Sequence, residues 1–273
     1  MSLDRLNQYT HTCFHERLKM KIIYILTSLI ILIPTAFSQV NIESFRNSAT
    51  KSGFFGEAKG NISFQHGNVN SQNYEIANAL HFKSNIHHIL LQSSLSKGYQ
   101  DKTQYRNSAF IHLRYTIMLH DLLGYEVFTQ TQYAEFKDLE LRQLNGAGVR
   151  FEKAFTNDKP FQIAIGTGIM SDHEELLYET TTQARSTSYL SISKSFTTDN
   201  SSFITAVTYY QPLIFNHSDY RINTEVNLRA SIINKKEYSL GLNISLTYLY
   251  DTVPAVKIEN TDVIFKTGLA ASW

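Results

Sequence analysis

Residues 108–133 read SAFIHLRYTIMLHDLLGYEVFTQTQY, and their pattern decides the fold. Apolar side chains recur at every second position of the first half, at Ala109, Ile111, Leu113, Tyr115 and Ile117. Mostly polar side chains lie between them, and the alternation resumes after a tight turn at His120-Asp121. Successive side chains of a strand point to opposite faces. The stretch therefore predicts two antiparallel strands, each with one apolar and one polar face.

The same alternation recurs beyond residue 39, where no helical period of 3.6 residues persists. Turn signals divide this part into twelve segments, near 53–66, 71–84, 88–99, 106–118, 124–136, 140–155, 160–170, 184–196, 202–213, 219–232, 237–250 and 261–273. Most exceed the roughly five or six residues of a soluble strand, and they suit the roughly 9–11 residues that cross a bilayer at a tilt. We therefore predict an all-β fold, a transmembrane antiparallel up-and-down β-barrel of about 12 strands.

The predicted connections alternate between short polar turns and longer loops, notably 171–183 and 251–260. This alternation is typical of outer-membrane barrels, and an even strand number places both termini on the short-turn, periplasmic side. A secreted β-sandwich or lipocalin-like barrel would show similar alternation within its strands. Aromatic residues near segment ends favour the membrane barrel because they suit interfacial girdles. They are Tyr99, Tyr105, Phe136, Phe196, Phe203, Tyr209 and Tyr210.

The N-terminal region carries the pattern of a secretory signal peptide. An apolar run over 22–37 follows Lys19 and Lys21, and small residues at 36 and 38 suit a cleavage site before Gln39. An uncleaved N-terminal anchor is the alternative. We expect residues 1–38 to be an upstream extension plus a cleaved signal peptide, with translation starting at Met20, and residues 39–273 to form the barrel.

Composition excludes several classes of function. A formal net charge of +1 provides no strong field for nucleic acid, so no nucleic-acid partner is expected. Cys13 is the only cysteine, which excludes a disulfide framework and a cysteine-built metal cluster. Charged residues make up only 18% of the chain, below the roughly 25% of soluble domains.

The last predicted strand alternates most regularly, and its apolar positions end on the only tryptophan. Phe265, Leu269 and Trp273 share one face of this strand. An amphipathic strand closing on an aromatic residue resembles the signal read by the outer-membrane barrel assembly machinery. We expect these three residues to form such a C-terminal assembly signal.

Residues 106–151 resemble the DUF481 family, which includes salt-induced outer-membrane proteins. Three motifs carry the resemblance: Phe110, His112, Arg114 and Tyr115; Gln130, Gln132, Tyr133, Glu135 and Phe136; and Leu139, Leu141, Arg142, Leu144, Gly146, Gly148, Arg150 and Phe151. Residues 67–75 also resemble the first hairpin of that family. The resemblance implies a barrel in the outer membrane. Together with the predicted signal peptide, it leads us to expect the outer membrane of a Gram-negative bacterium, reached after secretion through the inner membrane. It implies no reaction, because the family has no established activity.

The sequence offers no catalytic, cofactor or metal residues that we would assign. Lipid-deacylating barrels pair His and Ser two residues apart, and no His-x-Ser occurs here; His217 and Ser218 are adjacent. The segment Asp172-His173-Glu174-Glu175 has the residue types to bind a divalent cation, but a solvated loop is the favoured interpretation. We expect no enzyme.

Five charged residues fall on the polar faces of the fourth to sixth predicted strands: Arg114, Glu126, Arg142, Arg150 and Glu152. An arginine facing lipid at mid-bilayer costs about 2–4 kcal/mol, so these residues are expected to face the lumen. There they would form a paired network that fills the lumen, or line a pore.

The resulting function prediction is an outer-membrane barrel of unestablished activity, either a small-solute channel or an envelope-stress component. The alternatives are a barrel-embedded lipid-modifying hydrolase and a surface structural or binding protein acting through its loops. Expected partners are outer-membrane lipid, lipopolysaccharide and the assembly machinery.

Overall fold

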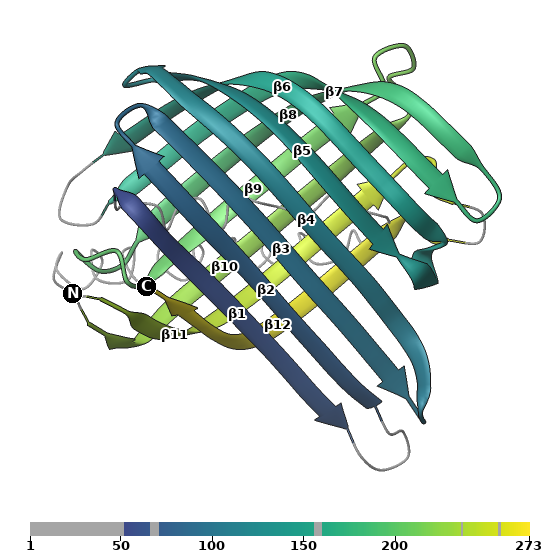
Figure 1. The fold of residues 1–273 in the computed structure, drawn as a ribbon, viewed down its shortest axis with the longest axis horizontal. Coiled ribbons are helices and arrows are strands. Elements are labelled where there is room, and N and C mark those ends of the chain that lie inside the picture. Colours follow the sequence, from purple (N-terminus) through teal and green to yellow (C-terminus); the bar gives the residue numbers. More distant parts are fainter. Residues whose placement is uncertain (1–51, 66–70, 156–159, 236, 256–257) are drawn as a thin grey trace, which may run out of the picture. The chain divides into compact units, whose positions relative to one another are not determined.

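The computed structural model describes residues 52–65, 71–155, 160–235, 237–255 and 258–273. Twelve antiparallel strands close into a barrel in which each strand pairs with its neighbours in sequence, and β1 pairs with β12 (Figure 1). They are β1 (Gly53–Gln65), β2 (Ser71–Ser84), β3 (His87–Gln100), β4 (Thr103–His120), β5 (Leu123–Ala134), β6 (Leu139–Phe155), β7 (Phe161–Leu176), β8 (Thr180–Ser195), β9 (Phe203–Pro212), β10 (Tyr220–Asn234), β11 (Ser239–Asp251) and β12 (Thr261–Ser272). The predicted fold and strand number are confirmed. The predicted extension, signal peptide and Met20 start lie outside the described residues.

The alternation in sequence places polar side chains inside the barrel and apolar side chains outside. In β4, His112 and Arg114 are buried, whereas Ile111 and Leu113 are exposed. The outer surface carries many large apolar side chains, including Phe265, which is 67% exposed. No helix among the described residues is long and apolar enough to cross a membrane.

The two rims differ less than the sequence predicts. The terminal rim, where β1 begins and β12 ends, carries the turns at 85–86 and 121–122 but also the longer connection 196–202. The opposite, distal rim carries a two-residue turn at 101–102, the short 3-10 helix η1 (Glu135–Lys137), the loop 213–219 and, among the described residues, the loop segments 252–255 and 258–260.

The long loop predicted at 171–183 is wrong, because β7 and β8 extend through most of it. Only residues 177–179 connect the two strands. The register of β6 with β7 continues through Arg142↔Glu174, so Glu174 belongs to the ladder. Polar residues occupy both faces here, as Asp172 and Glu174 alternate with His173 and Glu175. A strand with two polar faces lacks the apolar–polar contrast that reveals a strand in sequence.

Two of the predicted girdle aromatics are inside the barrel. Phe203 and Tyr209 are 4% and 2% exposed, whereas Tyr210 is 42% exposed. Adjacent residues of a strand face opposite sides, so Tyr209 and Tyr210 cannot both reach lipid. Tyr209 packs instead with Tyr189 and Val207.

The ladder that closes the barrel is short. β1 pairs with β2 over thirteen residues, from Gly53 to Gln65, but with β12 over only four, from Glu57↔Ser272 to Gly60↔Leu269. Two backbone hydrogen bonds between Gly56 and Trp273, both 3.1 Å, add to this ladder at the terminal rim.

Candidate functional site

A cavity of about 750 Å³ occupies the lumen toward the distal rim. Inward side chains from many strands line it, and loop residues such as Tyr178, which is 85% exposed, form its mouth. Binding pockets for small molecules have volumes of about 300–1,000 Å³. The cavity therefore has the size of a small-molecule site.

Three polar atoms in the cavity wall have no hydrogen-bond partner among the described residues. They are Gln92 Oε1, Ser96 Oγ and Asn243 Oδ1, and their side chains are buried. Buried polar atoms in folded proteins are almost always satisfied by protein, water or ligand. The three oxygen atoms are themselves buried, so a small side-chain movement is needed to present them to a molecule in the cavity.

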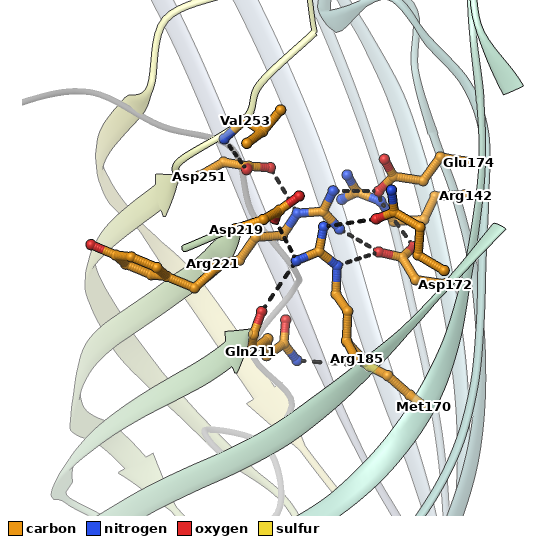
Figure 2. Close-up of polar contacts among 12 residues, drawn as sticks. Arg142, Met170, Asp172, Glu174, Arg185, Gln211, Asp219, Arg221, Asp251 and Val253 are labelled. Carbon is orange, nitrogen blue, oxygen red and sulfur yellow. Dashed lines mark hydrogen bonds and ion pairs between the residues drawn. The ribbon is translucent and has the colours of Figure 1, made fainter. Parts of the chain in front are cut away.

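One side of the cavity is formed by a group of buried charges that we call the distal cluster. Its members are Arg142, Asp172, Glu174, Arg185, Asp219, Arg221 and Asp251 (Figure 2). Asp172 Oδ2 lies 3.0 Å from Arg185 Nε and 2.5 Å from Arg221 Nη1, and Asp172 Oδ1 lies 3.9 Å from Arg142 Nε. Asp172 therefore forms ion pairs with three arginines.

The other carboxylates complete the distal cluster. Arg221 contacts Glu174 at 2.8 Å and Asp251 at 2.7 Å, and Arg142 also pairs with Glu174. Arg185 Nη1 donates to Asp219 Oδ1 at 2.8 Å. Three arginines and four carboxylates give a formal charge of −1. The contacts join β6, β7, β8, β10, the loop before β10, and β11.

A second group, the Tyr189 network, lies nearer the terminal rim. Its members are Arg114, Thr116, Glu126, Arg150, Glu152 and Tyr189. Arg114 Nη1 donates to Glu126 Oε2 at 2.9 Å, and Arg150 Nε donates to Glu152 Oε2 at 2.6 Å. The Tyr189 hydroxyl joins these two pairs, because it donates to Glu126 at 2.9 Å and accepts from Arg150 at 2.8 Å. Since β6 and β7 separate β5 from β8, this bridge crosses part of the lumen.

A third group of buried charges supports the closing ladder. Arg229 Nη1 contacts Glu57 Oε2 at 2.6 Å, and its Nη2 donates to Ser239 at 3.0 Å and Ser272 at 3.3 Å. Lys59 lies 3.2 Å from Glu57. Arg229 therefore connects β10 with β1, β11 and β12.

The structure divides the five charged residues selected from sequence between the two larger groups. Arg114, Glu126, Arg150 and Glu152 lie together in the Tyr189 network, whereas Arg142 belongs to the distal cluster. The side chains of all five point into the barrel.

Sequence reasoning missed most of the distal cluster. Arg185, Asp219, Arg221 and Asp251 come from the later strands and one loop, and only the fold brings them to Asp172. The one signal in the sequence is the i, i+2 spacing of Asp172 and Glu174, which places two carboxylates on one face of a strand.

The segment considered as a cation loop is part of this cluster. Asp172 and Glu174 point inward to arginines, whereas His173 bonds outside to Thr182 at 2.8 Å. No group of three or more His, Cys, Asp or Glu residues in the described ranges is arranged to hold a metal ion. The lumen instead offers paired charges and hydrogen-bond acceptors, which suit a small polar molecule.

Sequence comparison identifies the family. A family model described as "Protein of unknown function, DUF481" matches residues 61–273. The chain belongs to this family. The resemblance found in residues 106–151 is thereby confirmed and extended to residues 61–273, from the end of β1 through β12.

Several solved barrels are similar to the chain at low identity. A NanC porin is 10% identical with a TM-score of 0.45, covering 80% of this chain and 98% of that chain. A KdgM porin is 10% identical with a TM-score of 0.41, covering 81% and 98%. The translocator domain of the autotransporter NalP from Neisseria meningitidis is 8% identical with a TM-score of 0.39, covering 85% and 92%. No curated protein matches the sequence.

Proposed function

We propose that this protein is a small-solute channel of the outer membrane with a constricted lumen. One observation carries the proposal: a cavity of about 750 Å³ near the distal rim lies beyond a buried, hydrogen-bonded network nearer the terminal rim. A solute would enter from the distal side, bind in the cavity and pass when the Tyr189 network separates.

The outer surface supports a membrane location. Outward side chains of neighbouring strands are large and apolar, including Ile111, Val127, Ile165, Ile169 and Phe265. In water, such a continuous apolar surface would promote aggregation. In a bilayer, the same side chains contact lipid acyl chains. A closed barrel also satisfies backbone groups that the hydrocarbon region cannot hydrate.

The solute class follows from the cavity wall. After a small side-chain movement, the buried oxygen atoms of Gln92, Ser96 and Asn243 would accept hydrogen bonds from a solute, and charges of both signs lie nearby in ion pairs. A highly charged solute would have to break those pairs. We therefore propose a neutral or zwitterionic polar solute that donates hydrogen bonds.

Single-channel recording in planar bilayers tests the channel. Replacing Arg114 and Glu126 together by glutamine removes one neutral ion pair from the constriction, and we expect larger or more frequent conductance steps than in the wild type. Glu140→Gln is the matched control, because this exposed carboxylate lies outside all three groups of buried charges. Absence of steps in the wild type and in the double variant would remove the channel proposal.

We also propose that β12 carries the assembly signal. Phe265, Leu269 and Trp273 project outward and are 67%, 52% and 50% exposed, so the assembly machinery or outer-membrane lipid can contact them. Phe265→Ala should reduce the folded protein recovered from outer membranes, and Thr267→Ala on the same face is the control. Equal recovery of both variants would contradict the proposal.

A further inference from the structure

The closing ladder between β1 and β12 ends while both strands continue. Pairing stops at Gly60↔Leu269, although β1 runs to Gln65 and β12 begins at Thr261. The same register would pair residues 61–65 with 264–268, but none of these pairs forms among the described residues. In Figure 1 the two strands meet near the C-terminus and diverge from there. The barrel wall is therefore split toward the distal rim.

The split begins at a recognisable contact. A Cβ at Gly268 would lie only 1.7 Å from Asn61 Oδ1, so the Asn61 side chain occupies the space beside this glycine. Beyond that point the ion pair between Lys266 and Glu75, at 2.8 Å, joins β12 directly to β2 past β1. Side-chain contacts thus replace the missing backbone ladder on the inner side.

The split borders the lumen cavity. Asn61 and Glu75 line the cavity on one flank, and Ile264 and Lys266 line it on the other. On the outer side, Ile62 and Phe265 are 66% and 67% exposed on the two edges. The opening is therefore apolar toward the bilayer and charged toward the cavity.

Unpaired strand edges in hydrocarbon cost several kcal/mol for each unsatisfied backbone group, so barrels normally close completely. The cost is smaller where a strand edge borders a polar cavity, because polar groups in the cavity can hydrogen-bond the unpaired backbone groups. The opening is charged on its inner side and apolar on its outer side. A lipid-like molecule matches both sides, because its head group can bond to the charged side chains while its acyl chain contacts the apolar ones.

We propose that the gap between β1 and β12 is a lateral portal through which an acyl-chain amphiphile moves between the outer leaflet and the lumen cavity. This inference deepens the proposed function, because it adds a membrane-derived ligand to the same cavity. Glu75, Arg106 and Lys266 would contact the head group; Arg106 Nη2 already lies 3.5 Å from Glu75 Oε2. Ile62 and Phe265 would contact the chain.

A disulfide that closes the gap tests the portal. Ile62 and Thr267 both face outward and would stand opposite each other if the ladder continued, so Ile62→Cys with Thr267→Cys would close it. The matched control is Ala58→Cys with Ala271→Cys, a pair that is already opposed in the closed ladder. Both pairs are made with Cys13→Ser. If Ile62→Cys and Thr267→Cys do not oxidise together, a short bis-thiosulfonate reagent bridges them.

The probe is a zwitterionic lysophosphatidylcholine with a diazirine in its acyl chain, supplied in phosphatidylcholine vesicles that contain the protein. After illumination, mass spectrometry should find label on cavity residues of β3 and β11, including Gln92 and Asn243. Closing the gap should abolish this cavity label, reduction should restore it, and the oxidised control pair should keep it. Label on outward residues of the same strands should not change, which provides an internal standard.

Two results would overturn the portal: cavity label that persists after the gap is closed, or wild-type label confined to outward residues. A conductance measurement distinguishes failure of the portal proposal from failure of the channel proposal. The closed-gap variant should conduct ions along the barrel axis as the wild type does. Normal conductance without cavity label would leave the channel standing and remove the portal.

Discussion

The distal cluster and the Tyr189 network both bury arginine–carboxylate pairs inside one barrel, but their construction differs. In the distal cluster, Asp172 contacts three arginines, so separating any of them leaves a buried charge with fewer partners. In the Tyr189 network each arginine has its own glutamate, and a neutral hydroxyl joins the two pairs.

This difference indicates different roles. Removing the Tyr189 hydroxyl leaves the Arg114–Glu126 and Arg150–Glu152 ion pairs in place, which costs less than leaving an isolated buried charge. The distal cluster suits a fixed wall that holds the strand ends, whereas the Tyr189 network suits a constriction that opens.

Asp172→Asn should have the largest effect. It removes the charge shared by three buried arginines, and breaking a buried pair by removing one partner costs about 3–5 kcal/mol. Urea unfolding in detergent micelles, followed by heat-modifiable gel migration, measures the loss. Glu175→Gln, on the same strand but half-exposed, should change stability by no more than about 0.5 kcal/mol. Equal losses of stability for the two substitutions would contradict the role of the distal cluster as a fixed wall.

Tyr189→Phe should affect conductance more than folding. It removes two hydrogen bonds, but Glu126 keeps its contact with Arg114 and Arg150 keeps its contact with Glu152, so each lost bond should cost only about 0.5–1.5 kcal/mol. We expect more frequent open events in planar bilayers, with a smaller loss of stability than in Asp172→Asn. Tyr210→Phe, on the outer surface, is the control. A stability loss equal to that of Asp172→Asn would show that the network is also a fixed element.

Arg185→Lys should weaken the distal cluster moderately. Arg185 uses Nε for Asp172 and Nη1 for Asp219, and a lysine ammonium cannot reproduce this forked geometry. Loss of one buried hydrogen bond predicts a decrease of about 1 kcal/mol in the free energy of unfolding. The control is the reverse exchange at an exposed position, Lys194→Arg, which should leave the urea midpoint nearly unchanged. An unchanged urea midpoint would show that charge alone, without geometry, maintains the cluster.

Lys266→Gln should change stability little. Its pair with Glu75 is more accessible than either charge group, with side chains 27% and 15% exposed, and such pairs contribute about 0–1 kcal/mol. Urea unfolding of this variant and of Glu75→Gln should give similar small shifts. A loss as large as that from Asp172→Asn would show that this pair holds the split wall together.

Asp199, in the turn between β8 and β9, should show the smallest effect, because its side chain is exposed and solvent screens its interactions. Hydrogen bonds from the side chains of Ser201 and Thr197 and from the Ser201 backbone lower the pKa of Asp199 to about 2. Because this lies below the roughly 3.9 of an unfolded chain, the stabilisation is present above about pH 4 and is lost as pH falls toward 2. The difference in urea midpoint between the wild type and Asp199→Asn should therefore be constant above about pH 4 and decrease as the pH falls toward 2. A pH-independent difference would contradict it.

Much of the fold could be predicted from the sequence, because the period of two is a local property. The alternation in β4, β5 and β12 shows which side chains share a face, and burial of Arg114 beside exposed Leu113 agrees with it. The prediction of a long loop failed at β7 and β8. Here Asp172 and His173 point to opposite faces, so the strand is polar on both faces.

The candidate site could be predicted only in part. Arg114 and Glu126 lie on adjacent strands, so their pairing follows from a single hairpin. Tyr189 reaches Glu126 across two intervening strands, and Asp172 reaches Arg221 in a similar way. Such contacts depend on barrel curvature and register, which no local pattern records.

By itself, the sequence determined that the chain forms a barrel of about twelve strands with charged residues on the inner face, because side-chain direction in a strand depends only on position. Only the tertiary structure decided which charges meet, that the cavity lies toward the distal rim, and that β1 leaves β12 after Gly60. Closing a barrel fixes the distances between strands remote in sequence, and those distances determine each of these features.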